Sequence, residues 1–137
     1  MMKVNVNWEG EVSFKGSTES GHFYFMDGPE EAGGQNRGMR PMEALLISMG
    51  GCTSYDVVTI LKKSRQDINH CEAVITAERA DSIPKVFTKI HIHFVLSGDA
   101  LDPIAIERAI TLSAEKYCSA SIMLGKSVVI THDYEII

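Results

Sequence analysis

The chain has 137 residues, of which 45% are hydrophobic and 23% charged, a length and composition typical of one globular domain over residues 1–137. Its formal net charge is -5, and no long basic run is present, so nucleic acid and anionic membrane surfaces are disfavoured as partners. The N-terminus lacks the apolar core of a signal peptide, so we expect a cytoplasmic protein whose Cys52, Cys71 and Cys118 are free thiols, a transient redox pair or small buried side chains.

Three short β-strands are expected at the N-terminal end. Residues 4–8 alternate apolar and polar side chains, as a half-buried strand does. Val12 and Phe14 indicate a second strand, residues 15–20 a turn, and residues 22–26 a third strand. The pattern predicts a three-stranded antiparallel meander.

A glycine-rich loop over residues 27–40 follows, and its length suggests a functional role. Pro41 then favours the start of a helix that runs to about residue 65. Between residues 44 and 61 of this helix the only charged side chain is Asp56. A helix that is apolar nearly all round must be covered all round, which a small monomer can hardly do. We therefore expect an obligate homodimer.

Two alternating strands are expected over residues 72–79 and 85–97. One face of the second strand carries Val86, Thr88, Ile90, Ile92, Phe94 and Leu96, and the other carries Phe87, Lys89, His91, His93 and Val95. The two histidines could belong to a metal site with His22 or His132 as a third ligand. A polar, outward-facing strand surface is the better interpretation.

The dipeptide Asp102-Pro103 predicts a second helix, with the carboxylate as its cap. Its buried stripe is expected to comprise Ile106, Ala109, Ile110, Ser113 and Tyr117. A short helical turn over residues 119–124 and a strand over residues 127–136 complete the chain. The order βββ-α-ββ-α-α-β predicts an α+β fold in which helices pack on mostly antiparallel sheet.

Two cysteines have contexts that suggest chemistry. Cys52 follows Gly50 and Gly51, which would let a substrate or another backbone approach the sulfur. Cys118 lies at a helix break, where free amide groups would stabilise a thiolate. Either residue could instead be a small core side chain. Cys71, with no positive neighbour, is expected to be structural.

The same two contexts resemble the OsmC/Ohr family. Residues 40–53 are similar to the central family helix, which carries the reactive cysteine, and residues 116–121 are similar to the segment of the second cysteine. Residues 128–135 match the terminal strand, so the resemblance covers nearly the whole chain. The residues at 41–43 and 113–119 look most similar to the YhfA-like subgroup of that family.

The resemblance implies an OsmC-like fold, with mostly antiparallel sheet on a long central helix, in an intertwined homodimer. It also implies a thiol-dependent peroxidase that reduces organic hydroperoxides. Cys52 would attack the peroxide, Cys118 would trap the oxidised sulfur as a disulfide, and an external thiol would reduce it. Sulfur does this chemistry, so no metal or other cofactor is expected.

One departure from the family pattern affects this prediction. The family has a glutamate directly after the proline, where this chain has Met42, and Glu43 is turned about 100° around the helix. Arg37 and Arg40 are candidates for the arginine that holds the thiolate. The alternative is a catalytically weak or inactive homologue that binds an apolar or electrophilic small molecule at the dimer-interface cleft.

Overall fold

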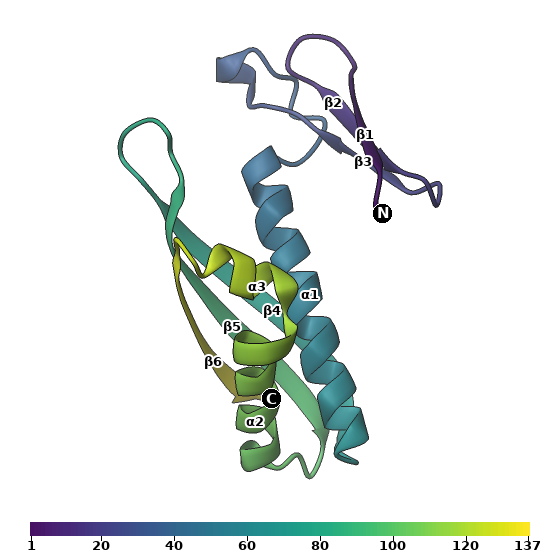
Figure 1. Ribbon diagram of the computed structural model, residues 1–137, viewed down its shortest axis with the longest axis vertical. Helices are drawn as coiled ribbons and strands as arrows, with labels where there is room; N and C mark the ends of the chain where they lie inside the picture. The colour runs from purple at the N-terminus through teal and green to yellow at the C-terminus, as the bar shows by residue number, and fades with distance from the viewer. The chain divides into compact units, whose positions relative to one another are not determined.

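The computed structural model describes residues 1–137, and it confirms the predicted α+β class and element order (Figure 1). The chain forms two compact units, Met1–Ile47 and Ser48–Ile137. Each unit has its own three-stranded sheet. The expectation of a single domain over residues 1–137 stays a prediction.

The sheet of the first unit is the predicted antiparallel meander of β1 (Val4–Trp8), β2 (Phe14–Thr18) and β3 (Phe23–Met26). The chain first reverses at Gly10 and Glu11, whose φ angles are 104° and 48°, close to the turn expected at Glu9 and Gly10. The turn predicted over residues 15–20 was wrong, because β2 extends to Thr18.

The loop after β3 is organised by one buried carboxylate. Asp27 is 3% exposed and accepts backbone N–H bonds from Gly28 (2.7 Å), Arg37 (3.2 Å) and Gln35 (3.3 Å). Burial alone would raise the pKa of Asp27, but these donors and the Arg37 charge lower it. A short 3₁₀ turn, η1 (Glu30–Ala32), lies within the loop. The glycine-rich segment is therefore a defined structure.

The long apolar helix is α1 (Pro41–Lys63), which begins at the predicted proline and ends close to the predicted residue. Its first turn is closed by Glu43, whose Oε1 accepts the backbone N–H of Arg40 at 2.8 Å. The helix is long and apolar enough to cross a membrane, but helices in the cores of soluble proteins share these properties. Several of its large apolar side chains are exposed on this chain, among them Leu45, Ile47 and Tyr55.

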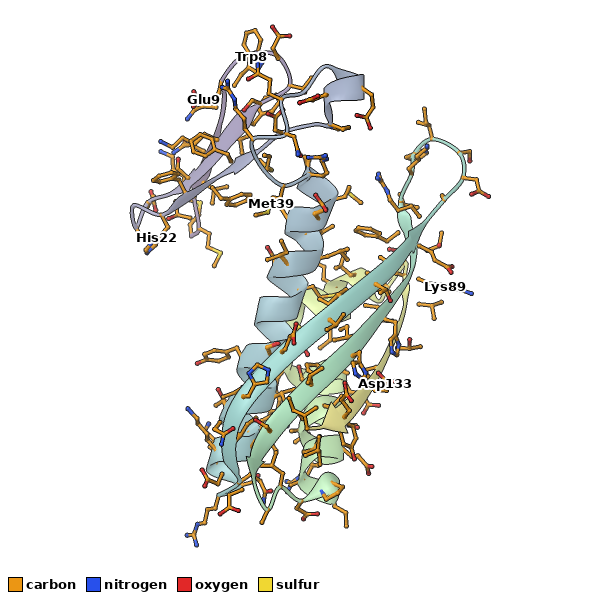
Figure 2. The ribbon with its side chains drawn as sticks, turned by 180° about the vertical axis from the view of Figure 1, so that it is seen from behind. Trp8, Glu9, His22, Met39, Lys89 and Asp133 are labelled. Atoms are coloured by element: carbon orange, nitrogen blue, oxygen red, sulfur yellow. The ribbon has the colours of Figure 1, made fainter.

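The sheet of the second unit has the order β4-β5-β6. Its strands are β4 (Asp67–Arg79), β5 (Phe87–Asp99) and β6 (Val129–Ile136). The β4–β5 pair is antiparallel and the β5–β6 pair is parallel. Between β5 and β6 lie α2 (Pro103–Leu112), the π-helical turn η2 (Ser113–Tyr117) and α3 (Ser119–Leu124). Figures 1 and 2 show these helices on one face of the sheet.

The core of this unit lies between the sheet and the helices. Its fully buried side chains include Val57, Leu61, Ile90, Ile92, Phe94, Leu96, Ile106 and Ala109. Two predicted burial assignments were wrong. Phe87 is 6% exposed because the register of β4 against β5 shifts between Glu78 and Arg79. Tyr117 is 50% exposed because η2 has the wider π-helical turn, which rotates its side chain off the buried stripe.

The other face of this sheet carries the two histidines of β5. Asp133 on β6 accepts from both, with its Oδ1 at 2.9 Å from His91 Nε2 and 2.7 Å from His93 Nδ1 (Figure 2 labels Asp133). The remaining ring nitrogens lie 2.7 Å from Thr131 Oγ1 and 3.1 Å from Glu135 Oε1. These hydrogen bonds make this face of the sheet polar, and the structure has no group of three His, Cys, Asp or Glu side chains that could hold a metal ion.

Candidate functional site

Two cysteines that lie far apart in the sequence meet in the second unit. Cys52 is half-buried on α1, and Cys118 is fully buried at the residue that caps α3. The two thiols lie close enough for Cys52 to raise the pKa of Cys118. Cys118 lies in the crossover of α2, η2 and α3 that connects the parallel strands β5 and β6, and this crossover brings it to α1. The residues next to either cysteine could not show that the two would meet.

The environment of Cys118 favours the protonated thiol. Burial raises its pKa, the hydroxyl and N–H groups of Ser121 lower it, and contact with Cys52 raises it again. The Ser121 N–H lies 3.3 Å from the Cys118 sulfur, as the helix break predicted. The Ser121 hydroxyl is buried and makes no well-directed hydrogen bond. The net shift of the pKa is upward, so Cys118 keeps its proton more readily than a free thiol.

The two glycines before Cys52 have different roles. A Cβ at Gly50 would lie 2.7 Å from Ile75 Cδ1, so this glycine lets α1 pack closely on β4. A Cβ at Gly51 would meet nothing within 4 Å, and Gly51 is exposed. Close helix packing therefore explains Gly50 and does not explain Gly51. Gly51 leaves open space directly beside the residue that carries the more accessible sulfur.

A buried polar chain connects α1 to the segment that carries Cys118. Ser113 Oγ lies 2.8 Å from Thr53 Oγ1 and donates to Asp56 Oδ2 at 2.9 Å. Ser113 is fully buried, and Thr53 is 3% exposed. The Ser113 carbonyl also accepts the Cys118 N–H at 2.8 Å. Neither Thr53 nor Ser113 was identified as a functional residue from the sequence, because the contact spans sixty positions.

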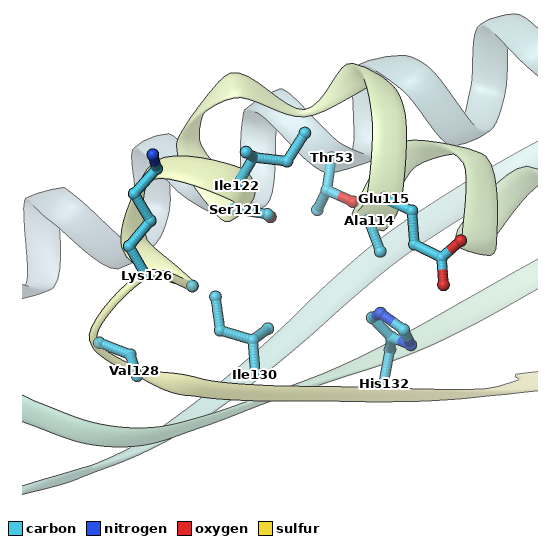
Figure 3. Close-up of a pocket in the computed structure, with 10 residues that line it drawn as sticks. Thr53, Ala114, Glu115, Ser121, Ile122, Lys126, Val128, Ile130 and His132 are labelled. Carbon is cyan, nitrogen blue, oxygen red and sulfur yellow. The ribbon is translucent and has the colours of Figure 1, made fainter.

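A cavity of about 440 Å³ opens next to these residues (Figure 3). Thr53 and Ser121 line it, and Figure 3 shows Glu115 of η2 and His132 of β6 on facing walls. Lys126 adds a positive charge. Thr53 directly follows Cys52, and the Ser121 N–H bonds the Cys118 sulfur. One neighbour of each cysteine therefore lines the cavity.

The other predicted site residues belong to the first unit. The Arg40 guanidinium donates to Asn36 Oδ1 at 2.8 Å and to the Gly38 carbonyl at 3.3 Å. Arg37 is exposed, and its backbone N–H is one of the donors to Asp27. The Glu43 carboxylate caps α1. A role for any of the three at the sulfur atoms stays a prediction.

Cys71 lies within β4, which begins at Asp67 and not at residue 72 as predicted. Burial raises the pKa of its thiol, and a hydrogen bond with Ser54 lowers it; the net shift is upward. Because the thiolate is disfavoured, Cys71 has no feature of an activated nucleophile.

The chain is similar to known proteins over nearly its whole length. Residues 33–133 match the family model described as OsmC-like protein. Protein YhfA of Escherichia coli (strain K12) is 44% identical over 136 residues, which cover 99% of this chain and 98% of YhfA.

Solved structures share the fold. A hypothetical protein from Aquifex aeolicus VF5 is 31% identical, with a TM-score of 0.84 over 100% of this chain and 98% of its own. The organic hydroperoxide resistance protein OhrB of Bacillus subtilis is 16% identical, with a TM-score of 0.67 over 98% of each chain. The second likeness concerns the fold alone.

Proposed function

Because the chain belongs to the OsmC-like protein family, we propose that it is a thiol-dependent peroxidase that reduces organic hydroperoxides. The observation that carries the proposal is the contact between the Cys52 and Cys118 side chains. The proposal requires the Cβ atoms of the two cysteines to come within about 4 Å, the spacing of a disulfide. The peroxide class comes from the name of the B. subtilis relative.

The two sulfur atoms divide the reaction. The Cys52 thiolate attacks one peroxide oxygen, the O–O bond breaks, and the alkoxide takes a proton to leave as an alcohol. Cys52 is then a sulfenic acid. The Cys118 sulfur attacks Cys52, the S–O bond breaks, water leaves and a disulfide forms. Two thiol groups of an external reductant restore both cysteines.

The difference in burial between the two cysteines supports this division of roles. Cys52 is the more exposed, and the space beside Gly51 gives a peroxide access to it. Cys118 is fully buried, and its raised pKa keeps it protonated until the sulfenic acid forms. Arg37, Arg40 and Glu43 belong to the proposal as groups that would support the Cys52 thiolate.

The proposed protein acts as a homodimer in the cytoplasm. Trp8, Val4 and Val6 on β1 are each more than half exposed, as are Ile47 and Tyr55 on α1. Exposed apolar surface of this extent is typical of a protein–protein interface. Light scattering at micromolar concentration should give twice the mass of the 15.1 kDa chain, and the mass of one chain would contradict the dimer.

Peroxide consumption tests the activity. Reduced protein with a dithiol should consume cumene hydroperoxide, and Cys52→Ser should abolish turnover. Cys71→Ser is the matched control, since Cys71 lies outside the thiol pair, and it should keep the wild-type rate. Equal rates for wild type and Cys52→Ser would refute the peroxidase.

One observation favours the alternative, a weak or inactive homologue that binds a small apolar or electrophilic molecule. Met42 occupies the place of the family glutamate, while the Glu43 carboxylate is engaged by the backbone of Arg40. This alternative predicts no turnover. It also predicts that the Met42→Glu variant consumes peroxide faster than the uncatalysed background rate. No gain in Met42→Glu, together with turnover in the wild type, would exclude it.

A further inference from the structure

The polar chain of Thr53, Ser113 and Asp56 touches both cysteine-bearing segments. Cys118 is tied to Ser113 by a backbone hydrogen bond of 2.8 Å that closes the π-helical turn η2. Ser113 is tied in turn to α1 through its side chain. Ser113 therefore links the two cysteine-bearing segments, through its side chain to α1 and through its carbonyl to Cys118.

The direction of the hydroxyl bonds follows from their partners. An ionised Asp56 carboxylate can only accept, so the Ser113 hydroxyl donates to it at 2.9 Å. The oxygen of Ser113 is then free to accept from the Thr53 hydroxyl at 2.8 Å. This order satisfies both hydroxyl protons. The bond to the carboxylate is charge-assisted and is the stronger of the two.

The sequence positions of the two α1 partners matter. Thr53 directly follows Cys52, and Asp56 lies one helical turn beyond Cys52 on the same side of α1. Ser113 thus binds α1 at two positions within the one helical turn that follows Cys52. A π-helical turn inside a helical segment often marks a functional site, and here it places the Ser113 carbonyl opposite the Cys118 N–H.

We propose that Ser113 is a positioning residue that holds Cys118 against Cys52 and so favours their disulfide. The inference rests on the proposed thiol pair but does not require that the oxidant be a peroxide. Without the Ser113 hydroxyl, the Cys118 segment is less firmly held to α1. The effective concentration of one sulfur at the other falls, and the dithiol form gains relative to the disulfide.

The experiment measures the dithiol–disulfide equilibrium of the full-length protein in glutathione buffers of graded poise. Alkylation and peptide mapping quantify the Cys52–Cys118 link without any peroxide. Ser113→Ala should shift the equilibrium constant about tenfold toward the dithiol, the value of one charge-assisted hydrogen bond. Ser113→Thr, which keeps the hydroxyl, should stay within about twofold of the wild type. Thr53→Val, which keeps the shape, should shift it in the same direction as Ser113→Ala.

Two controls separate positioning from general stability. Ile106→Val removes one buried methylene from α2 and should lower stability without changing the disulfide equilibrium. If Ser113→Ala does not fold, Thr53→Val alone decides the outcome. An unchanged equilibrium in Ser113→Ala or Thr53→Val, or an equal shift in Ile106→Val, would overturn the inference and leave the thiol pair intact. If the wild type forms no Cys52–Cys118 disulfide at any poise, both the proposed function and this inference fail.

Discussion

The Cys118 thiol is in contact with the thiol of Cys52, and burial together with this contact raises its pKa. A buried, protonated thiol beside a more exposed one suits a residue that acts second. We therefore predict that Cys118→Ser still reduces peroxide once but leaves Cys52 as a sulfenic acid. Dimedone labelling of Cys52 should appear in this variant and not in the wild type. Excess peroxide should then carry Cys52 on to the sulfinic acid. Equal labelling of both proteins would contradict the assigned order.

The sequence predicted what depends on neighbouring residues. Alternating side chains placed most of the strands, and Asp102-Pro103 located the start of α2, because both signals act within one turn or one strand. The helix break at Cys118 likewise predicted the N–H bond from Ser121. The apolar composition of α1 also follows directly from the printed residues.

Long-range contacts could not be predicted in the same way. Nothing local to Ser113 indicates that its hydroxyl bonds Thr53 and Asp56. The Asp27 carboxylate binds amides up to ten residues away, so the composition of the loop concealed its order. The π-helical turn that exposes Tyr117 depends on packing, and a regular helical period assigned that residue to the core.

The cap of α2 gives a prediction about stability. Asp102 Oδ1 accepts the Ile104 N–H at 3.0 Å, and the Asp102 N–H is itself held by Gln66. Asp102→Ala should lower the free energy of unfolding by about 1 kcal/mol, because the amide loses its side-chain acceptor. Urea denaturation measures the change. Asp99→Ala, at an exposed carboxylate near the same turn, should change stability by less than about 0.5 kcal/mol. Equal losses would show that the cap has no special effect.

The two glycines of α1 should respond differently to alanine. Gly51→Ala gains helix propensity without a clash and should raise the free energy of unfolding by about 0.5–1 kcal/mol. Gly50→Ala brings a methyl group against Ile75 and should be less stable than Gly51→Ala by about 1–3 kcal/mol. If the open space at Gly51 is the path to Cys52, iodoacetamide labelling of Cys52 should slow in Gly51→Ala. An unchanged labelling rate would argue against Gly51 as the path to Cys52.

The histidine–carboxylate contacts on the open face predict a pH dependence. Hydrogen bonds to Asp133 and Glu135 raise the pKa of His93. The stability that these bonds give the folded state is therefore complete below pH 6.5, the pKa of the unfolded chain, and is lost as the pH rises through the folded pKa. Hydrogen bonds from His93 and His91 lower the pKa of Asp133. The stability that these bonds give is therefore present above pH 3.8, the pKa of the unfolded chain, and is lost as the pH falls through the folded pKa. The contacts stabilise most between pH 3.8 and 6.5.

Asp133→Asn tests this window. The variant should lower the melting temperature most near the middle of the window and much less in alkaline buffer, where His93 is neutral. Glu72 and Glu78 on β4 and Lys89 on β5 also face this surface, so Glu78→Gln serves as a control for general charge effects. A loss in Asp133→Asn that is the same at every pH would contradict the linkage.

The most direct measurement is peptide mapping of the reduced protein after one equivalent of tert-butyl hydroperoxide. The account predicts a disulfide-linked peptide that joins Cys52 to Cys118, with Cys71 still free to react with an alkylating reagent. Recovery of Cys52 and Cys118 as two separately alkylated peptides, with the peroxide unconsumed, would contradict it.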